Sequence, residues 1–525
     1  MAAASLTEPG PHARLPGWLP LLLVVLAFAF QGTRGIWEPD EGRYTAVAVN
    51  MLESGDWLVP TLNGDEPHLT KPPLTYWLLA ASFAVLSHNE WAARLPGALA
   101  YVGTGLLVFG LARRLVPAAP VLATLAWALG LGTVMAANVV STDNLLALFE
   151  TAAVYAFVRA WHGRAEPDRR WIRLMWAGFG LAFLTKGPPG LLPLLAIVAF
   201  LAVHERASLR RLFDLPGLLV FALVAFTWFA LLVAQDPGRL GYFLGYEVYD
   251  RVFTAKHDRN AEWYGGLEVY GPVLLVGTLP WWPLALRAAG GPRRAWSACR
   301  ARLRSRHREW LLLAWWLLLP LAVFLLARSR LQLYVLPLFV PWALMVARPL
   351  AGWPWLTPAR LAATAGVTAA VLLGLKATLS HWPADRDARE MARSIDALLA
   401  AHGGAQLRSE SHARGRRPVL AGIDEIAFVG MRPFYGLRLY LDLEVESLQF
   451  EGAPIEYAKF VARESVCEEV AERERTVYAF KESRTGQFLD IVGGCPGVTP
   501  QPLGHIVADD NRIALYRVRG RPPPG

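Results

Sequence analysis

WEPDEGRYTAVAVNMLESGDWLVPTLNGDEPHLTKPPLTYW, residues 37–77, follows the first long apolar segment of the chain and leads into the second. We call these residues the first loop. It holds two adjacent carboxylates, Asp40 and Glu41, two cations, Arg43 and Lys71, and an acidic turn at 65–66. A loop that only connects two apolar segments does not need so much paired charge beside a membrane. We therefore interpret the first loop as half of an active site.

The composition predicts a polytopic membrane protein. The chain has 525 residues, 54% of them hydrophobic, with 21 Trp and a mean hydropathy of +0.31. Apolar runs of about 16 to 22 residues, long enough to span a bilayer, recur from Leu19 to about Leu375. The sequence then turns polar, which divides it into a transmembrane domain at 1–380 and one small soluble domain at 381–525.

The arginine-rich loops predict the topology. They fall on one side of the membrane only if the apolar segment 72–88 does not cross it, and the positive-inside rule makes that side the cytoplasm. We therefore expect about eleven crossings, with the N-terminus inside, the C-terminal domain outside, and 72–88 as an interfacial helix. The net charge of +9 sets orientation in this interpretation, so we do not expect nucleic-acid binding.

The same topology places the polar stretches of the sequence together on the outer side. Besides the first loop these are 141–143, 185–188, 235–266 and the stretch 328–330 that leads to Tyr334. Because the loops were assigned by arginine content, this clustering is an independent observation. It predicts that the chemistry takes place on the outer face.

Two interpretations stay open for the charges of the first loop. Asp40 and Glu41 could cap a helix, which is worth about 0.3–1 kcal/mol, or one of them could accept a proton from an attacking hydroxyl. Arg43 would then be placed to meet an anion. Lys71, before two prolines, could anchor to lipid headgroups or meet a phosphate at the membrane surface.

The later outer stretches leave similar alternatives. Asp143 follows Ser141 and Thr142 and could be a helix cap, whereas Glu150 lies inside an apolar segment, where acidic residues usually face a cavity or a partner. A tight Gly-Pro turn at 185–190 does not require Lys186. The loop 246–264 mixes cations with aromatic residues, which suits either lipid headgroups or a phosphate and a sugar.

Six motifs occur in order and are taken together: PDEGRYTAVAVNMLESGDWLVP at 39–60, KPPLTYW at 71–77, ARLPGAL at 93–99, TDNLL at 142–146, TKGPPG at 185–190 and SRLQLYVLPLFVP at 329–341. With these motifs the chain resembles the polytopic lipid-sugar glycosyltransferases of the GT-C architecture. Within that class it looks most like the aminoarabinose transferases that modify lipid A and the bacterial protein-mannosyltransferase-like enzymes. The C-terminal domain carries no motif of this kind.

The resemblance implies an inverting pentosyl- or hexosyltransferase of the bacterial inner membrane. Its donor would be a sugar on a polyprenyl phosphate, usually undecaprenyl phosphate. Its acceptor would be an envelope molecule such as lipid A, another glycan or a protein, at the periplasmic face. The alternative function is a transporter or flippase of lipid-linked sugars, but such proteins place ionisable groups near the membrane midplane, and here only Glu150 does so.

The resemblance also implies roles for individual residues. Asp40 looks like the catalytic base, Asp143 looks like a second active-site acid, and Glu41 is a further catalytic candidate. The candidates for binding the donor phosphate, directly or as supporting contacts, are Lys71, Arg43, Arg251, Arg259, Lys186 and Tyr334.

A divalent metal is an open question. Aminoarabinose transferases usually carry Glu directly before Lys-Pro-Pro, and that Glu and a His from the later loop have been linked to a metal. This chain has Thr70 at that position, and Thr is a poor ligand. His257 is the one candidate metal ligand that we retain.

The C-terminal domain reads as a small mixed α/β domain. Strand-like stretches occur at Arg417–Ala421, Leu437–Leu441 and Thr476–Phe480, and a helical one at Asp385–Ala401. Cys467 and Cys495 both lie in this domain and could pair if it is exported.

Overall fold

The computed structural model describes residues 14–62, 67–164, 166–245, 260, 262–304, 307–401, 423–450, 466–472, 475–495 and 497–520. By its contacts the chain divides into two compact units. The helical unit comprises Met1–Ala29 and Gly97–Thr378, and the mixed unit comprises Phe30–Pro96 and Leu379–Gly525. The first loop therefore groups with the C-terminal residues, which the expected division at 380/381 did not anticipate.

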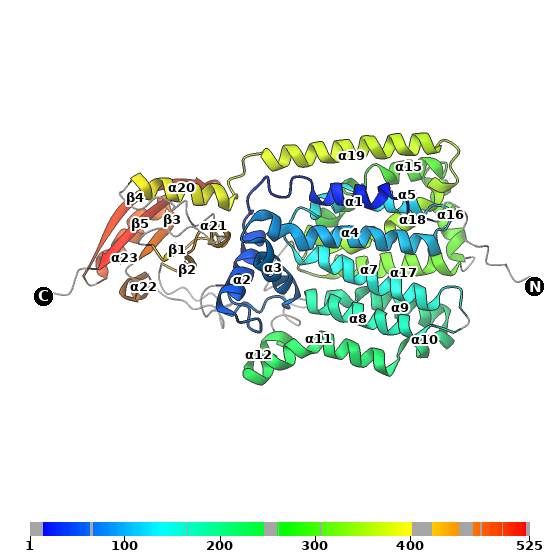
Figure 1. The fold of residues 1–525 in the computed structure, drawn as a ribbon, viewed down its shortest axis with the longest axis horizontal. Coiled ribbons are helices and arrows are strands. Elements are labelled where there is room, and N and C mark those ends of the chain that lie inside the picture. Colours follow the sequence, from blue (N-terminus) through cyan, green and yellow to red (C-terminus); the bar gives the residue numbers. More distant parts are fainter. Residues whose placement is uncertain are drawn as a thin grey trace, which may run out of the picture. The chain divides into compact units, whose positions relative to one another are not determined.

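The helical unit is built from helices, most of them apolar, which are drawn from blue through cyan and green to yellow in Figure 1. They are α1 (Trp18–Phe28), α4 (Glu90–Leu115, from Gly97 onward), α5 (Pro120–Ala128), α6 (Leu131–Ala136), α7 (Thr142–Trp161), α8 (Arg169–Lys186), η2 (Pro188–Leu191), α9 (Leu192–His204), α10 (Arg206–Leu212), α11 (Leu215–Gln235), α12 (Gly238–Gly241), α14 (Gly265–Val276), α15 (Trp281–Ala288), α16 (Pro292–Arg304), α17 (Arg308–Leu326), η4 (Gln332–Leu338), α18 (Phe339–Ala351) and α19 (Pro358–His381).

The described helices support a membrane-spanning unit. Five of them are long and apolar enough to cross a bilayer by length and composition. The helices α14 and α15, with a bend of 75° between them, form either a further broken span or a re-entrant loop. The helix α7 is also long, with 20 residues, but it carries Asp143, Glu150 and Arg159. The expected apolar segments coincide with helices, whereas the number of crossings stays a prediction.

In the mixed unit the segment 72–88 is a short helix. The helix α3 (Leu74–Leu86) has 13 residues and a length of about 20 Å at 1.5 Å per residue, less than the roughly 30 Å of a bilayer core. It packs against α2 (Asp40–Ser54). The helices α1 and α9, with 11 and 13 residues, are equally short, so the interfacial placement of this segment stays a prediction.

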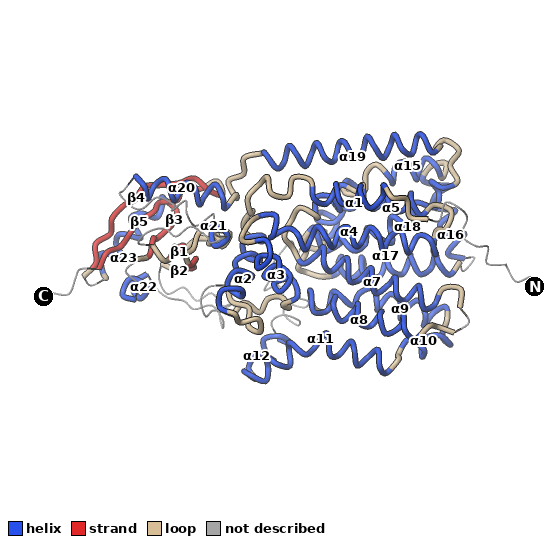
Figure 2. Tube along the Cα trace, in the orientation of Figure 1, coloured by secondary structure: helices blue, strands red, loops and turns tan. Residues whose placement is uncertain are grey.

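The C-terminal part of the mixed unit is built around a five-stranded sheet with the order β2-β1-β3-β5-β4, red in Figure 2. The strands are β1 (Glu425–Val429), β2 (Glu444–Leu448), β3 (Thr476–Lys481), β4 (Val498–Ala508) and β5 (Asn511–Gly520). The first three are parallel, and β4 and β5 form an antiparallel hairpin.

Helices cover both faces of this sheet because successive side chains of a strand point to opposite faces. Ile426 and Phe428 of β1 share a core with α20 (Ala388–Ala401) and α21 (Leu437–Tyr440). Ala427 and Val429 share a second core with α22 (Val466–Glu472) and α23 (Thr485–Gly494). The predicted mixed α/β domain is confirmed.

The individual predictions for this domain have mixed outcomes. The helix at 385–401 and the strand at 476–480 are confirmed as α20 and β3. The strand at Leu437–Leu441 is wrong, because these residues form α21. Leu437 and Leu441 both enter the core beside α20, and their spacing of four residues fits a helical turn as well as a strand. The stretch 417–421 lies outside the described residues.

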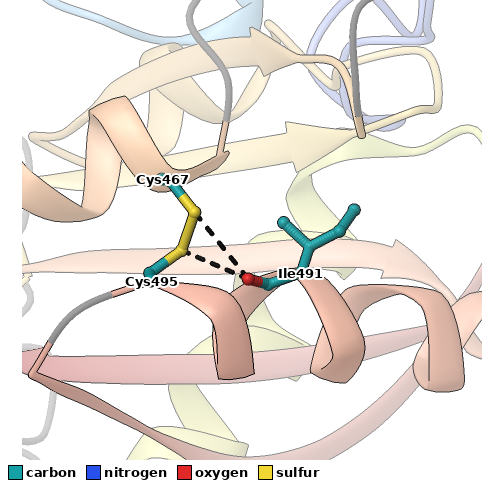
Figure 3. Close-up of a disulfide and its surroundings, with 3 residues drawn as sticks. All are labelled: Cys467, Ile491 and Cys495. Atoms are coloured by element: carbon teal, nitrogen blue, oxygen red, sulfur yellow. Dashed lines mark hydrogen bonds between the residues drawn. A yellow bond between two sulfur atoms is a disulfide. The ribbon is translucent and has the colours of Figure 1, made fainter.

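A disulfide joins Cys467 at the start of α22 to Cys495 after α23, with a Cα–Cα distance of 5.5 Å. Figure 3 shows it beside the main chain of Ile491. It closes 28 residues of sequence, so it ties α22 to the helix that shares its face of the sheet. The pairing left open by the sequence is therefore present in the structure.

Candidate active site

Asp40 is the first residue of α2, and it is open to solvent. Its side chain is 54% exposed and forms an ion pair with Arg43, one turn further along the helix. A carboxylate in the first turn of a helix also interacts favourably with the helix dipole. Asp40 thus combines a fixed position with access for a substrate, and the neighbouring carboxylate does not.

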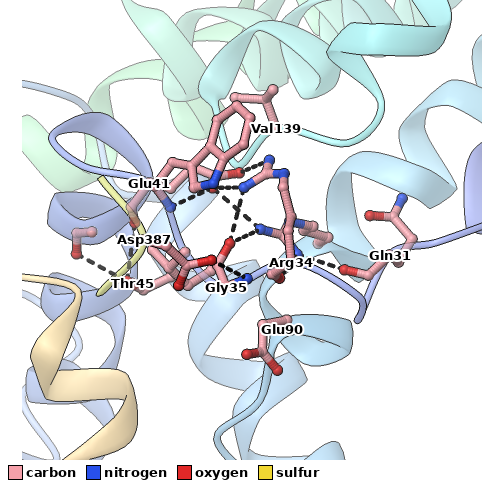
Figure 4. Close-up of polar contacts among 12 residues, drawn as sticks. Gln31, Arg34, Gly35, Glu41, Thr45, Glu90, Val139 and Asp387 are labelled. Carbon is pink, nitrogen blue, oxygen red and sulfur yellow. Dashed lines mark hydrogen bonds and ion pairs between the residues drawn. The ribbon is translucent and has the colours of Figure 1, made fainter. Parts of the chain in front are cut away.

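Glu41 is buried and already occupied. Both of its oxygens accept hydrogen bonds from Arg34, at 2.6 and 2.9 Å, and one also accepts from the Trp37 N–H at 2.9 Å and from Arg94 at 3.3 Å. Figure 4 shows the guanidinium of Arg34 against Glu41. Burial alone would raise the pKa of Glu41, but the charges of Arg34 and Arg94 with these hydrogen bonds lower it to about 2.

Arg94 was missed as a site residue by sequence reasoning. Its guanidinium donates to the main-chain carbonyls of Gln31 at 2.5 Å, Arg34 at 3.0 Å and Gly35 at 2.7 Å. It therefore fixes the chain that leads into α2. The available signal was the motif ARLPGAL, in which an Arg interrupts an apolar stretch.

Glu38, two residues before Asp40, connects the first loop to the C-terminal residues of the mixed unit. It is buried, and it accepts a hydrogen bond from the N–H of Gly436. Burial raises the pKa of Glu38 to about 8, although the Gly436 hydrogen bond and the charge of Arg43 act in the opposite direction. The contact is therefore made mainly by a neutral carboxylic acid at pH 7.

Further polar contacts surround the start of α2. The Gly35 N–H donates to Asp387 at 2.9 Å, and the Ile36 N–H donates to the hydroxyl of Tyr440 at 2.9 Å. Arg438 donates to Glu53 near the end of α2, at 2.8 Å. The C-terminal residues of the mixed unit thus hold α2 near both ends.

A basic cluster forms beside Asp40 within the mixed unit. Burial, with the charges of Arg43 and Lys71, lowers the pKa of His68 to about 3, so His68 is neutral. Its Nε2 lies 2.9 Å from the Thr70 hydroxyl, and Lys71 donates to the Thr70 carbonyl at 3.1 Å. The structure thus brings Asp40, Arg43 and Lys71 into one neighbourhood, and the positive charge of this neighbourhood suits a phosphate.

A second group of predicted residues meets in the helical unit. Asp143 in the first turn of α7 forms an ion pair with Lys186, the last residue of α8, and both side chains are buried. The Lys186 ammonium also lies 4.1 Å from the ring centroid of Tyr334. Ser141 caps α7 by accepting a hydrogen bond from the Asp143 N–H. Glu150, two turns further along α7, is buried as well.

Arg330 is another residue that sequence reasoning missed. It is buried, and its guanidinium donates to the carbonyls of Asn260 at 2.5 Å, Glu262 at 2.7 Å and Leu325 at 3.0 Å. It therefore holds the end of the loop that precedes α14. Its signal was the motif SRLQLY, from which only Tyr334 was selected.

Three predicted residues, Arg251, Arg259 and His257, lie outside the described residues. Within the described ranges, three possible metal ligands meet only at Glu425, Glu446 and Glu469 in the sheet domain, and none of these was predicted. The Thr70 hydroxyl contacts His68 instead. Because the candidate ligand His257 lies outside the described residues, the metal stays a prediction, and we derive no step through one.

The architecture matches a membrane glycosyltransferase of known structure. The fold of the chain is that of ArnT from Cupriavidus metallidurans, which was crystallised with undecaprenyl phosphate bound. The TM-score is 0.70 with 20% sequence identity, and the match covers 95% of this chain and 98% of ArnT. The apo form of ArnT gives a TM-score of 0.71. The GT-C fold implied by the motifs is confirmed.

The sequence comparisons agree with this class. Residues 70–232 match the family described as dolichyl-phosphate-mannose-protein mannosyltransferase. The undecaprenyl phosphate-alpha-4-amino-4-deoxy-L-arabinose arabinosyl transferase of Pectobacterium carotovorum is 32% identical over 61% of this chain and 56% of the relative. The enzyme of the same name from Edwardsiella ictaluri is 29% identical over 64% and 59%. The alignments thus span little more than half the length of these relatives.

Proposed function

We propose that this chain is an inverting membrane glycosyltransferase that moves a pentose or hexose from a polyprenyl phosphate, such as undecaprenyl phosphate, to an envelope acceptor. The acceptor would be lipid A, another glycan or a protein. The observation that carries the proposal is the exposed carboxylate of Asp40 beside the cluster of Arg43 and Lys71. The likeness in fold to ArnT, and the similarity to the arabinosyl transferases, support it.

The arrangement suits displacement of a lipid phosphate. Asp40 accepts the proton of the acceptor hydroxyl, whose oxygen forms a bond to the anomeric carbon from the side opposite the phosphate. The bond between that carbon and the phosphate oxygen breaks, and its electron pair remains on the polyprenyl phosphate. Lys71 and Arg43 stabilise the charge that develops there. Attack from the opposite side inverts the configuration.

The two carboxylates at the start of α2 take different parts in this proposal. Asp40 is the base because it is exposed and its partner Arg43 is also a phosphate-binding candidate. Glu41 is a positioning residue, because Arg34, Arg94 and Trp37 occupy its oxygens. It holds the first turn of α2, and with it Asp40.

Asp143 remains a proposed second active-site acid, and Lys186 and Tyr334 remain proposed supporting contacts to the donor phosphate. These residues form a buried polar group at one end of the helical unit. Arg251 and Arg259 remain proposed phosphate ligands on the resemblance alone. We assign no reaction step to His257.

We further propose that the protein lies in the bacterial inner membrane with about eleven crossings and a periplasmic C-terminal domain. Disulfides persist in oxidising compartments, so the pair Cys467–Cys495 supports this orientation. A C-terminal tag should react with a membrane-impermeant reagent in spheroplasts. A tag that reacts only after the inner membrane is opened would contradict the topology.

The deciding experiment uses the purified full chain in proteoliposomes with polyprenyl-phosphate sugars and extracted envelope lipids. Transfer predicts release of polyprenyl phosphate and a sugar adduct on an acceptor, both visible by mass spectrometry. The alternative, a flippase, predicts movement of the intact sugar lipid between leaflets without an acceptor. Comparison of envelope lipids and glycans from cells with and without the protein then identifies the acceptor.

A further inference from the structure

The helix α16 differs from the other helices of its length in the helical unit. Its sequence is PRRAWSACRARLR, and none of its residues is buried. It has five arginines and no acidic residue. Trp296, near its middle, is 65% exposed. The proposed reaction assigns no role to α16.

The apolar and the basic residues of α16 lie on different sides of the helix. At 3.6 residues per turn, Trp296, Cys299 and Leu303 fall on one side of the helix. Arg293, Arg300 and Arg304 form a row directly beside this apolar side by the same spacing. A narrow apolar face bordered by cations is typical of helices that lie in a membrane interface.

The side that faces α17 is a different one. The guanidinium of Arg302 lies 5.2 Å from the ring centroid of Trp310 in α17. On the helical wheel Arg302 is about a quarter turn from the centre of the apolar side. The contact with α17 therefore leaves Trp296 and Leu303 exposed, and both are exposed in the structure.

The position of α16 along the helical unit follows from its neighbours. The helix α7 runs from the Asp143–Lys186 pair to Trp161, whose ring centroid lies 5.1 Å from the guanidinium of Arg308. Arg308 is the first residue of α17, and α16 ends four positions earlier in the sequence, at Arg304. The helix α16 therefore lies at the end of the unit opposite Asp143 and Lys186.

The same end of the unit is basic beyond α16. Arg308 donates to Glu205 at 2.5 Å, and Glu205 directly precedes α10, which contains Arg206, Arg210 and Arg211. Arginine accumulates at the membrane face that meets the anionic leaflet. Charge complementarity thus indicates that an anionic lipid surface covers the apolar side of α16 and the arginine row beside it.

We propose that α16 lies in the headgroup layer at this end of the helical unit and binds anionic phospholipid. Trp296, Cys299 and Leu303 enter the boundary of the acyl chains, and Arg293, Arg300 and Arg304 bind lipid phosphates. The neighbouring helices favour this placement. In the sequence α16 lies between α15 and α17, and α17 is long and apolar enough to cross a bilayer. The proposal is independent of the sugar that the protein transfers.

The chain offers its own probe for a test. Of its three cysteines, Cys467 and Cys495 are paired, and Cys299 is the free one on the apolar side. A spin label on Cys299 in the full chain, reconstituted in nanodiscs, reports depth through its accessibility to oxygen and to a water-soluble nickel complex. The matched control carries Ala301→Cys with Cys299→Ser, which moves the label to the exposed opposite side of α16.

In nanodiscs of phosphatidylcholine mixed with phosphatidylglycerol, the Cys299 label should favour oxygen several-fold over nickel, and the control label should favour nickel. Phosphatidylcholine alone should reduce the preference at Cys299, as should the combined variant Arg293→Gln, Arg300→Gln and Arg304→Gln in the mixed lipids. Equal nickel accessibility at both positions would overturn the proposal. A Cys299 label shielded from both reagents would also overturn it and would indicate a protein partner. A preference for oxygen that does not depend on lipid charge would overturn it as well.

Discussion

The carboxyl group of Glu38 accepts a hydrogen bond from the N–H of Gly436, 398 positions later in the chain. Its other oxygen is buried and has no hydrogen-bond partner among the described residues. Burial raises the pKa of Glu38 to about 8. A protonated acid at this place avoids a buried negative charge beside Asp40 and Glu41.

This pKa predicts how pH affects the mixed unit. The unfolded chain loses the Glu38 proton near the ordinary pKa of 4.5, whereas the folded chain keeps it until about 8. The stability that this group contributes is therefore fully present below pH 4.5 and is lost as pH rises toward 8, at no more than about 1.4 kcal/mol per pH unit. Glu38→Gln keeps an acceptor for Gly436 and cannot ionise, so its melting temperature should fall less between pH 6 and pH 9.

The matched control for this measurement is Glu390→Gln. Glu390 lies in α20 of the same unit, and its ion pair with Arg393 is exposed, so the substitution should leave the pH dependence unchanged. Identical pH profiles for the wild type and Glu38→Gln would show that Glu38 is already ionised in the folded protein.

The ion pairs of Glu41 predict a structural defect when that carboxylate is removed. Glu41→Ala leaves Arg34 and Arg94 buried without it, and breaking a buried ion pair costs roughly 3–5 kcal/mol. We expect a lower folded yield and a lower melting temperature, measured by size exclusion and thermal unfolding. The converse result, a fully stable Glu41→Gln protein without transfer activity, would assign Glu41 a catalytic role.

Local patterns predicted the helices well because each apolar run determines its own helix. The segment 310–328 became α17 and 358–378 became α19. The order of the apolar segments also predicted that Asp143 and Lys186 lie at the same end of the helical unit, because α7 and α8 are consecutive and antiparallel. At 437–441 the local pattern was ambiguous, and packing against α20 selected the helix.

The polar network around α2 could not be predicted in this way. Its partners are separated by 59 residues for Arg94 and Gly35, and by 352 for Gly35 and Asp387. No periodicity in the sequence connects such positions. A carboxylate such as Glu41 therefore looked equivalent to Asp40 until burial distinguished them.

The pair Asp143–Lys186 should behave as one unit in a double-mutant cycle. Asp143→Asn and Lys186→Gln each remove one member of a buried ion pair, so each should destabilise the protein. The double variant should be less unstable than the sum of the two, with a coupling of roughly 0.5–3 kcal/mol, measured by thermal unfolding. Strict additivity would mean that the two charges do not interact in the membrane-embedded protein.

The disulfide predicts a thiol count and a stability change. Without reductant the unfolded chain should react with one equivalent of a thiol reagent at Cys299, and with three equivalents after reduction. For a loop of 28 residues the chain-entropy model gives about 3.5 kcal/mol. The variant Cys467→Ser with Cys495→Ser should therefore unfold at lower temperature. Three reactive thiols without reductant would contradict the pairing.

Asp40→Asn provides the sharpest test of the proposed chemistry. The amide keeps the size of the side chain and can still accept a hydrogen bond from Arg43, but it cannot take the proton of an acceptor hydroxyl. Because Asp40 is exposed, stability should change little, while the transfer rate should fall by roughly 10²–10⁴. Asp56→Asn, a second exposed carboxylate of the first loop that caps the N–H groups of Leu58 and Val59, is the control and should keep wild-type transfer. Full transfer by Asp40→Asn in proteoliposomes would remove Asp40 as the base and leave Asp143 as the remaining predicted acid whose oxygens are not held by two arginines.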